Sequence, residues 1–337
     1  MKTVSTFVAA AVVATFGANM ASAQDTSDYI LATASTGGTY YPVGVALSTL
    51  VKVKLQPGMG IGMSAISSAG SGENVRLLRE DEAQFAILQG LYGFYAASGT
   101  GPLEDVGPQE NLRSVSMLWQ NVEHFVAASD AAPTGTMEDF VNLTGEAVAL
   151  GAQNSGTLGS NAALLSGLGV DVETDYELVY GGYGPAAEAL QNGQVKGIST
   201  PAGVPVGALS QLFASAGDSV TLLNFTDEQR TAADGGRDLW TAYTIPANTY
   251  SGQTEDVVTV AQPNFLAVGA DVDEENVYQI TKTIYENLPF LQAIHPATNA
   301  MNIDAAIAGL PLPLHPGAVR YYQEIGMDIP DRLIPAQ

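Results

Sequence analysis

The sequence contains no cysteine among its 337 residues. This absence excludes a disulfide framework, a thiol nucleophile, cysteine-bound zinc and a lipid anchor attached to cysteine. Positive charge is also scarce, because 12 Lys and Arg residues stand against 35 Asp and Glu residues, for a net charge of −23. Nucleic acids and anionic lipid surfaces are bound by clustered Lys and Arg, so the sequence predicts that neither is a partner of this chain.

Long apolar runs are absent as well. The longest N-terminal run, Val4 to Phe16, is too short for the ~20 residues that span a bilayer. It follows Lys2 and precedes Ala21 and Ala23, a pattern typical of a signal peptide cleaved after Ala23. We therefore expect export to the periplasm without membrane insertion of the mature chain. Loss of Lys2 leaves 11 basic against 35 acidic residues, a net charge of −24.

What the chain does contain is an alternation of short apolar strands, small-residue turns and segments of helix length. This alternation is typical of α/β architecture. The 46% hydrophobic content and the 36 glycines fit a folded, loop-rich protein, and the length favours two domains. Four strand–turn–helix modules are recognisable, with Gly/Ser/Thr-rich turns at residues 35–42, 67–72, 151–157 and 181–185.

The order of the modules predicts two lobes of similar design. Two modules precede a crossing segment at residues 114–128 and two follow it, and a return crossing is expected between residues 220 and 245. We assign lobe I to residues 24–122 and 226–337, and lobe II to residues 123–225. The amphipathic stretch 274–288 is expected to pack back on lobe I. Ligands of such α/β proteins bind where the strand ends face the cleft between the lobes.

The small-residue turns suggest what the cleft could bind. A strand that ends in Gly, Ser and Thr ahead of a helix presents free backbone N–H groups and hydroxyls, with the positive end of the helix behind them. Several such turns on one cleft could hold a carboxylate without Lys or Arg. The alternative is that each turn only caps its own helix.

Signatures of enzymes are missing. The sequence has no G-x-S-x-G elbow and no phosphate-binding G-x-x-x-x-G-K-[ST] loop. Residues 182–187 match G-x-G-x-x-A, but Pro185 removes an N–H group and no acidic residue follows about 20 positions later. His124, His295 and His315 lie far apart in the sequence. We therefore expect no catalytic residue, no metal and no cofactor.

Four segments together resemble the TAXI family, the solute receptors of tripartite ATP-independent periplasmic (TRAP) transporters. They are STGGTYYPVG at 35–44, SAGSGENVRLL at 68–78, AILQG ending at Gly90, and HPGAVRYYQEIG at 315–326. The resemblance extends over essentially the whole mature chain. It implies a type II periplasmic binding protein fold, in which two α/β lobes joined by hinge strands close on a small organic anion such as glutamate, 2-oxoglutarate or a related carboxylate. It also implies delivery of this ligand to a TRAP membrane permease driven by an ion gradient.

Position by position, the resemblance implies ligand contacts from both lobes. The implied contacts are Gly38, Thr39, Tyr40, Ser68, Ser71 and Gln89 in lobe I, and Asn154, Ser155, Gly156, Thr157, Tyr183 and Pro201 in lobe II. The second turn reads SAGSG where the family more often has a pattern like SGGS, which leaves the hydroxyl contacts at that turn open. We expect a monomer. The alternatives are an exported hydrolase or transferase on the same fold, and a protein that presents its ligand to a sensor kinase.

Overall fold

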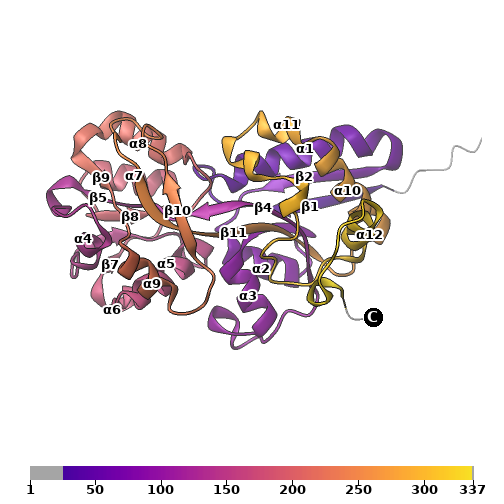
Figure 1. The fold of residues 1–337 in the computed structure, drawn as a ribbon, viewed down its shortest axis with the longest axis horizontal. Coiled ribbons are helices and arrows are strands. Elements are labelled where there is room, and N and C mark those ends of the chain that lie inside the picture. Colours follow the sequence, from indigo (N-terminus) through magenta and orange to yellow (C-terminus); the bar gives the residue numbers. More distant parts are fainter. Residues whose placement is uncertain (1–25, 336–337) are drawn as a thin grey trace, which may run out of the picture.

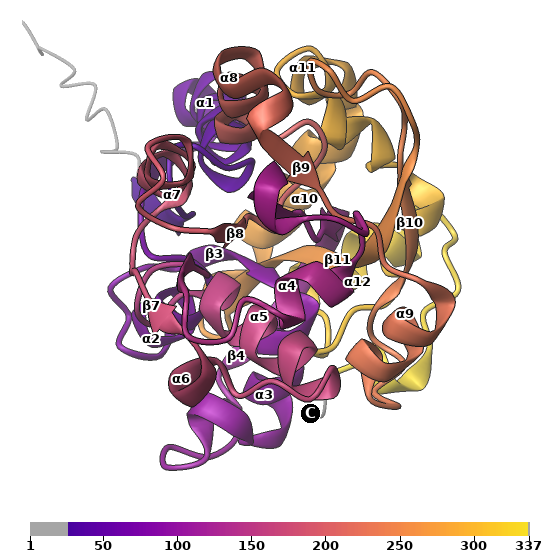
Figure 2. The same ribbon diagram turned by 90° about the vertical axis from the view of Figure 1, so that its left-hand side faces the viewer.

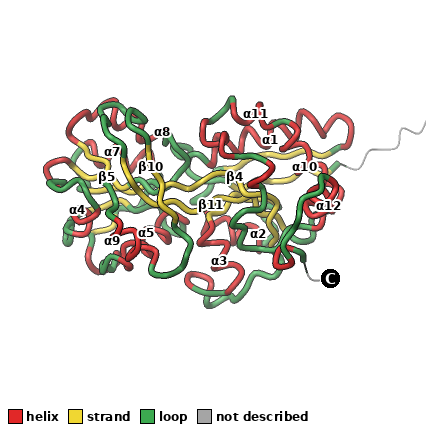
Figure 3. Tube along the Cα trace, viewed as in Figure 1, coloured by secondary structure: helices red, strands yellow, loops and turns green. Residues whose placement is uncertain are grey.

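The structure is a computed structural model that describes residues 26–335. The signal peptide expected at residues 1–23 lies outside the described residues. Figure 1 shows two lobes side by side, and Figure 3 shows that their strands form a central layer with helices above and below it. The mixed α/β fold with two sheets confirms the fold class expected from the sequence.

The sheet of the first lobe combines parallel and antiparallel strands in the order β10-β11-β3-β1-β2, with β4 also paired to β11. Strand β1 is parallel to both β2 and β3, whereas β11 is antiparallel to β3, β4 and β10. All residues of β3 are buried, which agrees with the apolar run Phe85–Leu88 that precedes Gln89. The strands are β1 (Ser27–Ala32), β2 (Ile61–Ile66), β3 (Phe85–Gln89), β4 (Leu112–Val122), β10 (Thr241–Ile245) and β11 (Val257–Gly269).

The sheet of the second lobe has the order β7-β6-β8-β5-β9, and Figure 2 shows the molecule with this lobe toward the viewer. Strand β6 is parallel to β7 and β8, whereas β5 is antiparallel to β8 and β9. The strands are β5 (Phe125–Ala128), β6 (Ala147–Ala149), β7 (Glu177–Leu178), β8 (Gly197–Ser199) and β9 (Val220–Leu222).

Helices cover both faces of each sheet (Figure 1). In the first lobe they are α1 (Tyr40–Met59), α2 (Ser71–Arg79), α3 (Gly90–Ser98), α10 (Glu274–Glu286), α11 (Leu288–Gln292) and α12 (Pro316–Glu324). In the second lobe they are α4 (Met137–Val141), α5 (Gly156–Gly167), α6 (Val172–Asp175), α7 (Tyr183–Gln191), α8 (Gly207–Ala216) and α9 (Asp227–Asp234). The four predicted modules correspond to the pairs β1–α1, β2–α2, β6–α5 and β7–α7.

Two long strands, β4 and β11, pair with each other and run from one lobe into the other (Figure 1). Strand β4 leads into β5 of the second sheet, as the crossing predicted at residues 114–128 requires. The return crossing that the sequence places between residues 220 and 245 stays a prediction: within that range the chain passes from β9 of the second sheet to β10 of the first. The end of β10 still packs with the second lobe, because Ile245, Tyr250 and Val257 belong to the same hydrophobic cluster as Val126 and Ile198, and the chain then runs into the first lobe along β11.

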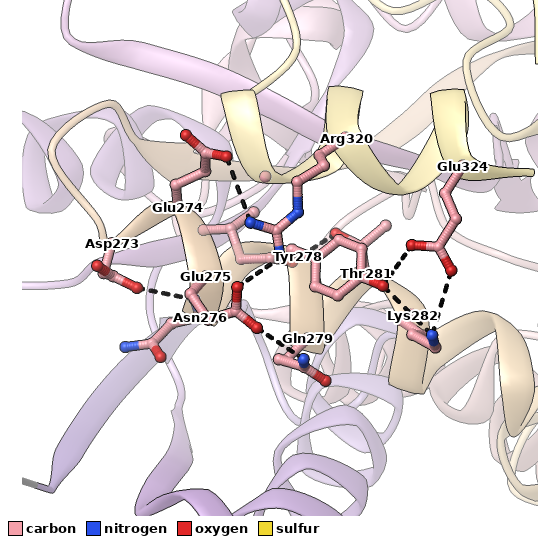
Figure 4. Close-up of polar contacts among 12 residues, drawn as sticks. Asp273, Glu274, Glu275, Asn276, Tyr278, Gln279, Thr281, Lys282, Arg320 and Glu324 are labelled. Carbon is pink, nitrogen blue, oxygen red and sulfur yellow. Dashed lines mark hydrogen bonds and ion pairs between the residues drawn. The ribbon is translucent and has the colours of Figure 1, made fainter.

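The C-terminal helices close the first lobe, as expected. Helix α10 packs on both α1 and α12. The guanidinium of Arg320 lies over the ring of Tyr278, with its carbon 3.9 Å from the ring centroid, and forms ion pairs with Glu274 and Glu275. Figure 4 shows this cluster, in which Lys282 also pairs with Glu324. These cations are therefore engaged on the outer surface of α10 and α12.

Candidate ligand-binding site between the lobes

A cavity of about 360 Å³ lies between the lobes. The predicted contact residues that line it are Gly38, Thr39, Tyr40, Ser68, Ser71, Gln89, Ser155, Gly156, Thr157, Tyr183 and Pro201. The structure therefore brings together segments that are far apart in the sequence. Their role in ligand binding remains a prediction.

Asn154 is the predicted contact that does not line the cavity. Its φ is +58°, and its carbonyl accepts a hydrogen bond from the N–H of Glu73 in the opposite lobe, at 3.0 Å. It thus takes part in the contact between the lobes. Conversely, the cavity wall includes Ser35 and Asn121, which the sequence analysis does not name as contacts. Asn121 lies in the crossing strand β4, where no turn or motif marks it.

The wall of the cavity is built from the beginnings of four helices. The residues that precede α1, α2, α5 and α7 are Thr39, Gly70, Ser155 and Gly182, and all four line the cavity. Gly70 has a φ of +112°, which residues other than glycine rarely adopt. Because the first N–H groups of a helix lack partners within it, the four positive helix ends converge on this space.

Hydrogen bonds join the lobes around the cavity. The hydroxyl of Thr39 donates to the carbonyl of Gly203 at 2.9 Å, and the side-chain amide of Gln89 donates to the carbonyl of Gly156 at 2.7 Å. On the same rim, the N–H of Ala208 donates to the carbonyl of Gly37 at 3.1 Å. The cavity is therefore enclosed by two lobes in contact.

Glycines permit this close contact. A methyl group added to Gly72 of α2 would lie 2.2 Å from the carbonyl oxygen of Asn154, in the other lobe. Methyl groups on Gly156 and Gly159 of α5 would lie 2.7 Å from Cβ of Ser71 and 2.4 Å from the phenol oxygen of Tyr92, respectively. These glycines allow α2 and α5 to approach each other across the cleft.

Three of the predicted contacts donate their hydroxyl hydrogens to other groups of the protein. Thr39 donates to Gly203, as described above. Tyr40 donates to Oδ1 of Asn264, and Tyr183 donates to the carbonyl of Pro201 at 2.6 Å. Burial raises the pKa of both tyrosines, so these phenols stay protonated at neutral pH. Their hydrogens are occupied because each side chain reaches an acceptor distant in the sequence.

Three serines keep a different arrangement. The hydroxyl oxygen of Ser35 accepts from the N–H of Tyr183 at 3.3 Å, and that of Ser71 accepts from the N–H of Gln89 at 3.1 Å. Ser155 accepts from a backbone N–H of its own helix at 3.0 Å. In Ser35 and Ser155 these bonds use the oxygen as an acceptor and leave the hydrogen available. The Ser71 hydroxyl is also hydrogen-bonded to Tyr40. The hydroxyls of Ser35 and Ser155 and the helix N–H groups are therefore the donors that the wall offers to an anion. Ser68, which also lines the cavity, donates instead to the carbonyl of Thr33 at 2.9 Å.

The wall has no charged residue among residues 26–335. The carboxyl group of Glu123 is buried between β4 and β5, two residues after Asn121 of the cavity wall. Burial raises the pKa of Glu123 to about 8, while the neighbouring Trp240 and Gln262 side chains lower it. Next to it, burial lowers the pKa of His124 to about 4. The His124 ring forms hydrogen bonds with the carbonyl of Val122 at 2.8 Å and with the phenol of Tyr250 at 2.9 Å. Both bonds fit a neutral structural histidine.

Within the part of the chain that the structure describes, no group of three or more His, Asp or Glu side chains is placed to hold a metal ion. No helix within residues 26–335 has both the length and the apolar character needed to cross a bilayer.

The sequence model that describes the NMT1-like family matches residues 31–326 of the chain. The protein belongs to the NMT1-like family. Its TAXI and TRAP assignment is finer than this match and stays a prediction.

Solved structures agree on the fold of this NMT1-like protein. MatC from Rhodopseudomonas palustris with bound malate is similar with a TM-score of 0.55 and 16% identity, over 88% of this chain and 96% of that one. The periplasmic binding protein BugD has a TM-score of 0.51 and 11% identity, over 88% and 94%. A protein from Bordetella bronchiseptica RB50 has a TM-score of 0.52 and 13% identity, over 90% of both chains. The fold is that of periplasmic binding proteins.

Proposed function

We propose that this NMT1-like protein is a periplasmic solute-binding protein that holds a small organic acid between its lobes. The observation that carries the proposal is the convergence of four helix N-termini, two from each lobe, on one cavity. A carboxylate there would accept hydrogen bonds from backbone N–H groups at positive helix ends. Such contacts contribute about 0.3–2 kcal/mol each, so several together approach the about −8 kcal/mol of micromolar binding.

The acidity of the chain is compatible with an anionic ligand. Charges on the surface are screened over about 8 Å at physiological salt, so the net charge of −23 slows the approach of an anion more than it weakens contacts inside the cavity. We propose a dicarboxylate of the size of glutamate or 2-oxoglutarate, or a related carboxylate. The bound malate of the structurally similar MatC supports an organic acid of this size.

The location and the partner are part of the same proposal. The N-terminal segment resembles a signal peptide, which supports export to the periplasm, and we propose that the chain acts as a monomer. The four segments that resemble the TAXI family support a TRAP permease as the membrane partner. Closure of the lobes would create the surface that the permease recognises. The proposal includes no covalent step.

A thermal-shift screen of the mature chain, residues 24–337, tests the proposal. Dicarboxylates, amino acids and keto acids are compared at equal concentration. An acid present at 100 times its Kd should stabilise the protein by about 2.7 kcal/mol and raise the unfolding midpoint. The proposal is wrong if no carboxylate raises the midpoint. Recovery of chemically altered acid after incubation would favour the hydrolase or transferase alternative instead.

A further inference from the structure

Asn121 is a polar side chain in the cavity wall that is only 1% exposed. Its amide nitrogen donates to Oε1 of Gln89 at 3.2 Å, and the amide nitrogen of Gln89 donates to the carbonyl of Gly156 at 2.7 Å. The three groups form a chain that runs from the crossing strand β4 through the first lobe to the start of α5.

This chain fixes which way each amide faces. A backbone carbonyl can only accept, so Gln89 must turn its NH₂ group toward Gly156. The oxygen of Gln89 then faces Asn121 and can only accept, so Asn121 must turn its NH₂ group toward Gln89. The remaining atom, Oδ1 of Asn121, is buried without a hydrogen-bond partner among the residues that the structure describes. An unsatisfied buried acceptor costs about 1–3 kcal/mol, which a donor on a ligand would offset.

A second acceptor in the wall is fixed by the same reasoning. Tyr183 gives its only hydrogen to the carbonyl of Pro201 at 2.6 Å. In the 2.9 Å contact between Thr157 and Tyr183, Thr157 must therefore be the donor. The oxygen of Thr157 then offers only lone pairs to the cavity. The cavity thus combines donors for a carboxylate with oriented side-chain acceptors for another group of the ligand.

We propose that Asn121 selects acids that carry a hydroxyl donor beside the carboxylate; this rests on the proposed function and names its substrate class. A hydroxyl satisfies Oδ1 of Asn121 with one hydrogen bond. A keto oxygen would place an acceptor against an acceptor, and a methylene would leave Oδ1 unpaired. An ammonium group would be buried beside a wall that has no anionic side chain within residues 26–335, which makes it the poorer donor at this position.

The first experiment measures Kd for acids that share one skeleton. Glutarate, 2-oxoglutarate, glutamate and each enantiomer of 2-hydroxyglutarate differ only at C2, and succinate with each enantiomer of malate repeats the comparison in a shorter acid. One enantiomer of the hydroxy acid should bind about 2- to 10-fold more tightly than the unsubstituted acid. Equal affinities, or tightest binding of the keto or amino acid, would overturn the inference and leave the proposed function intact. If no acid of either series binds, both are wrong.

The second experiment compares Asn121→Leu with Thr39→Val. Leucine removes the acceptor, so the ratio of Kd values between the unsubstituted and the hydroxy acid should fall to about one. Thr39→Val removes a hydrogen bond between the lobes and should weaken the binding of all acids to the same extent, so the ratio of Kd values should stay unchanged. Should Asn121→Leu fail to fold, Asn121→Asp takes its place and should shift the preference toward glutamate. A ratio that neither substitution of Asn121 alters would refute the assignment.

Discussion

Gly72→Ala should act as a wedge between the lobes while leaving each lobe folded. Gly72 lies in the first turn of α2, where alanine favours the helix by about 0.5–1 kcal/mol over glycine. The added methyl would lie 2.2 Å from the carbonyl oxygen of Asn154, a backbone atom of the opposite lobe that cannot rotate away. The substitution therefore penalises the closed arrangement and not the helix that carries it.

The size of the effect follows from the contacts next to Gly72. Real Cβ atoms essentially never approach a heavy atom closer than 3.0 Å, so the lobes must separate there by at least 3.0 − 2.2 = 0.8 Å. The 3.0 Å bond from the N–H of Glu73 to Asn154 would be broken by this movement, and a neighbouring bond between the lobes would be weakened. Loss of one or two such bonds costs about 1–3 kcal/mol, which corresponds to about 5- to 150-fold weaker ligand binding.

Isothermal titration calorimetry would measure this loss with the acid that gives the largest thermal shift. The matched control is Gly58→Ala in α1, where an added methyl meets no heavy atom within 4 Å. We expect the control to bind like the wild type, and the unliganded Gly72→Ala protein to unfold near the wild-type midpoint. Wild-type affinity in Gly72→Ala would refute the reasoning that the closed arrangement is the one that binds the ligand.

Other substitutions test the same site and its hinge. Thr39→Val should weaken every bound acid about 2- to 10-fold in calorimetry, because it removes one hydrogen bond between the lobes; an unchanged Kd would contradict this role. Gly159→Ala should lower the ligand affinity less than Gly72→Ala does, because its methyl would meet the end of the Tyr92 side chain and not a backbone atom. A larger loss of affinity would be inconsistent with this explanation. The pKa of Glu123 is raised to about 8, so the folded state retains a proton that the unfolded state loses above pH 4.5, and stability should fall as pH rises from 6.5 to 8 by about 1.4 kcal/mol per pH unit at most. Glu123→Gln should flatten this fall in thermal unfolding, and an equal slope in the variant would disprove it. The pKa of His124 is lowered to about 4, so in that background stability should fall as pH drops from 6.5 toward 4, a slope that His124→Gln should remove.

The sequence by itself determined the modules and most of the cavity wall. Apolar strands followed by small-residue turns predict where helices such as α1 and α5 begin. Because the segments after parallel strands emerge at one edge of a sheet, residues in those turns, such as Thr39 and Tyr183, were expected to face a common cleft. Both residues line the cavity. The local rules suffice here because strand, turn and helix are set by neighbours in the chain.

Only the tertiary structure decided what each side chain does in that cavity. The hydroxyl of Thr39 donates to Gly203, 164 residues away, and not into the cavity. Asn121 lies in a strand without any motif, and its role depends on the orientation of Gln89 from another strand. The return along β11 was decided by burial of Ile245 and Val257 against the second sheet. Hydrogen-bond partners and packing faces of this kind depend on distances between remote segments, which composition and spacing do not contain.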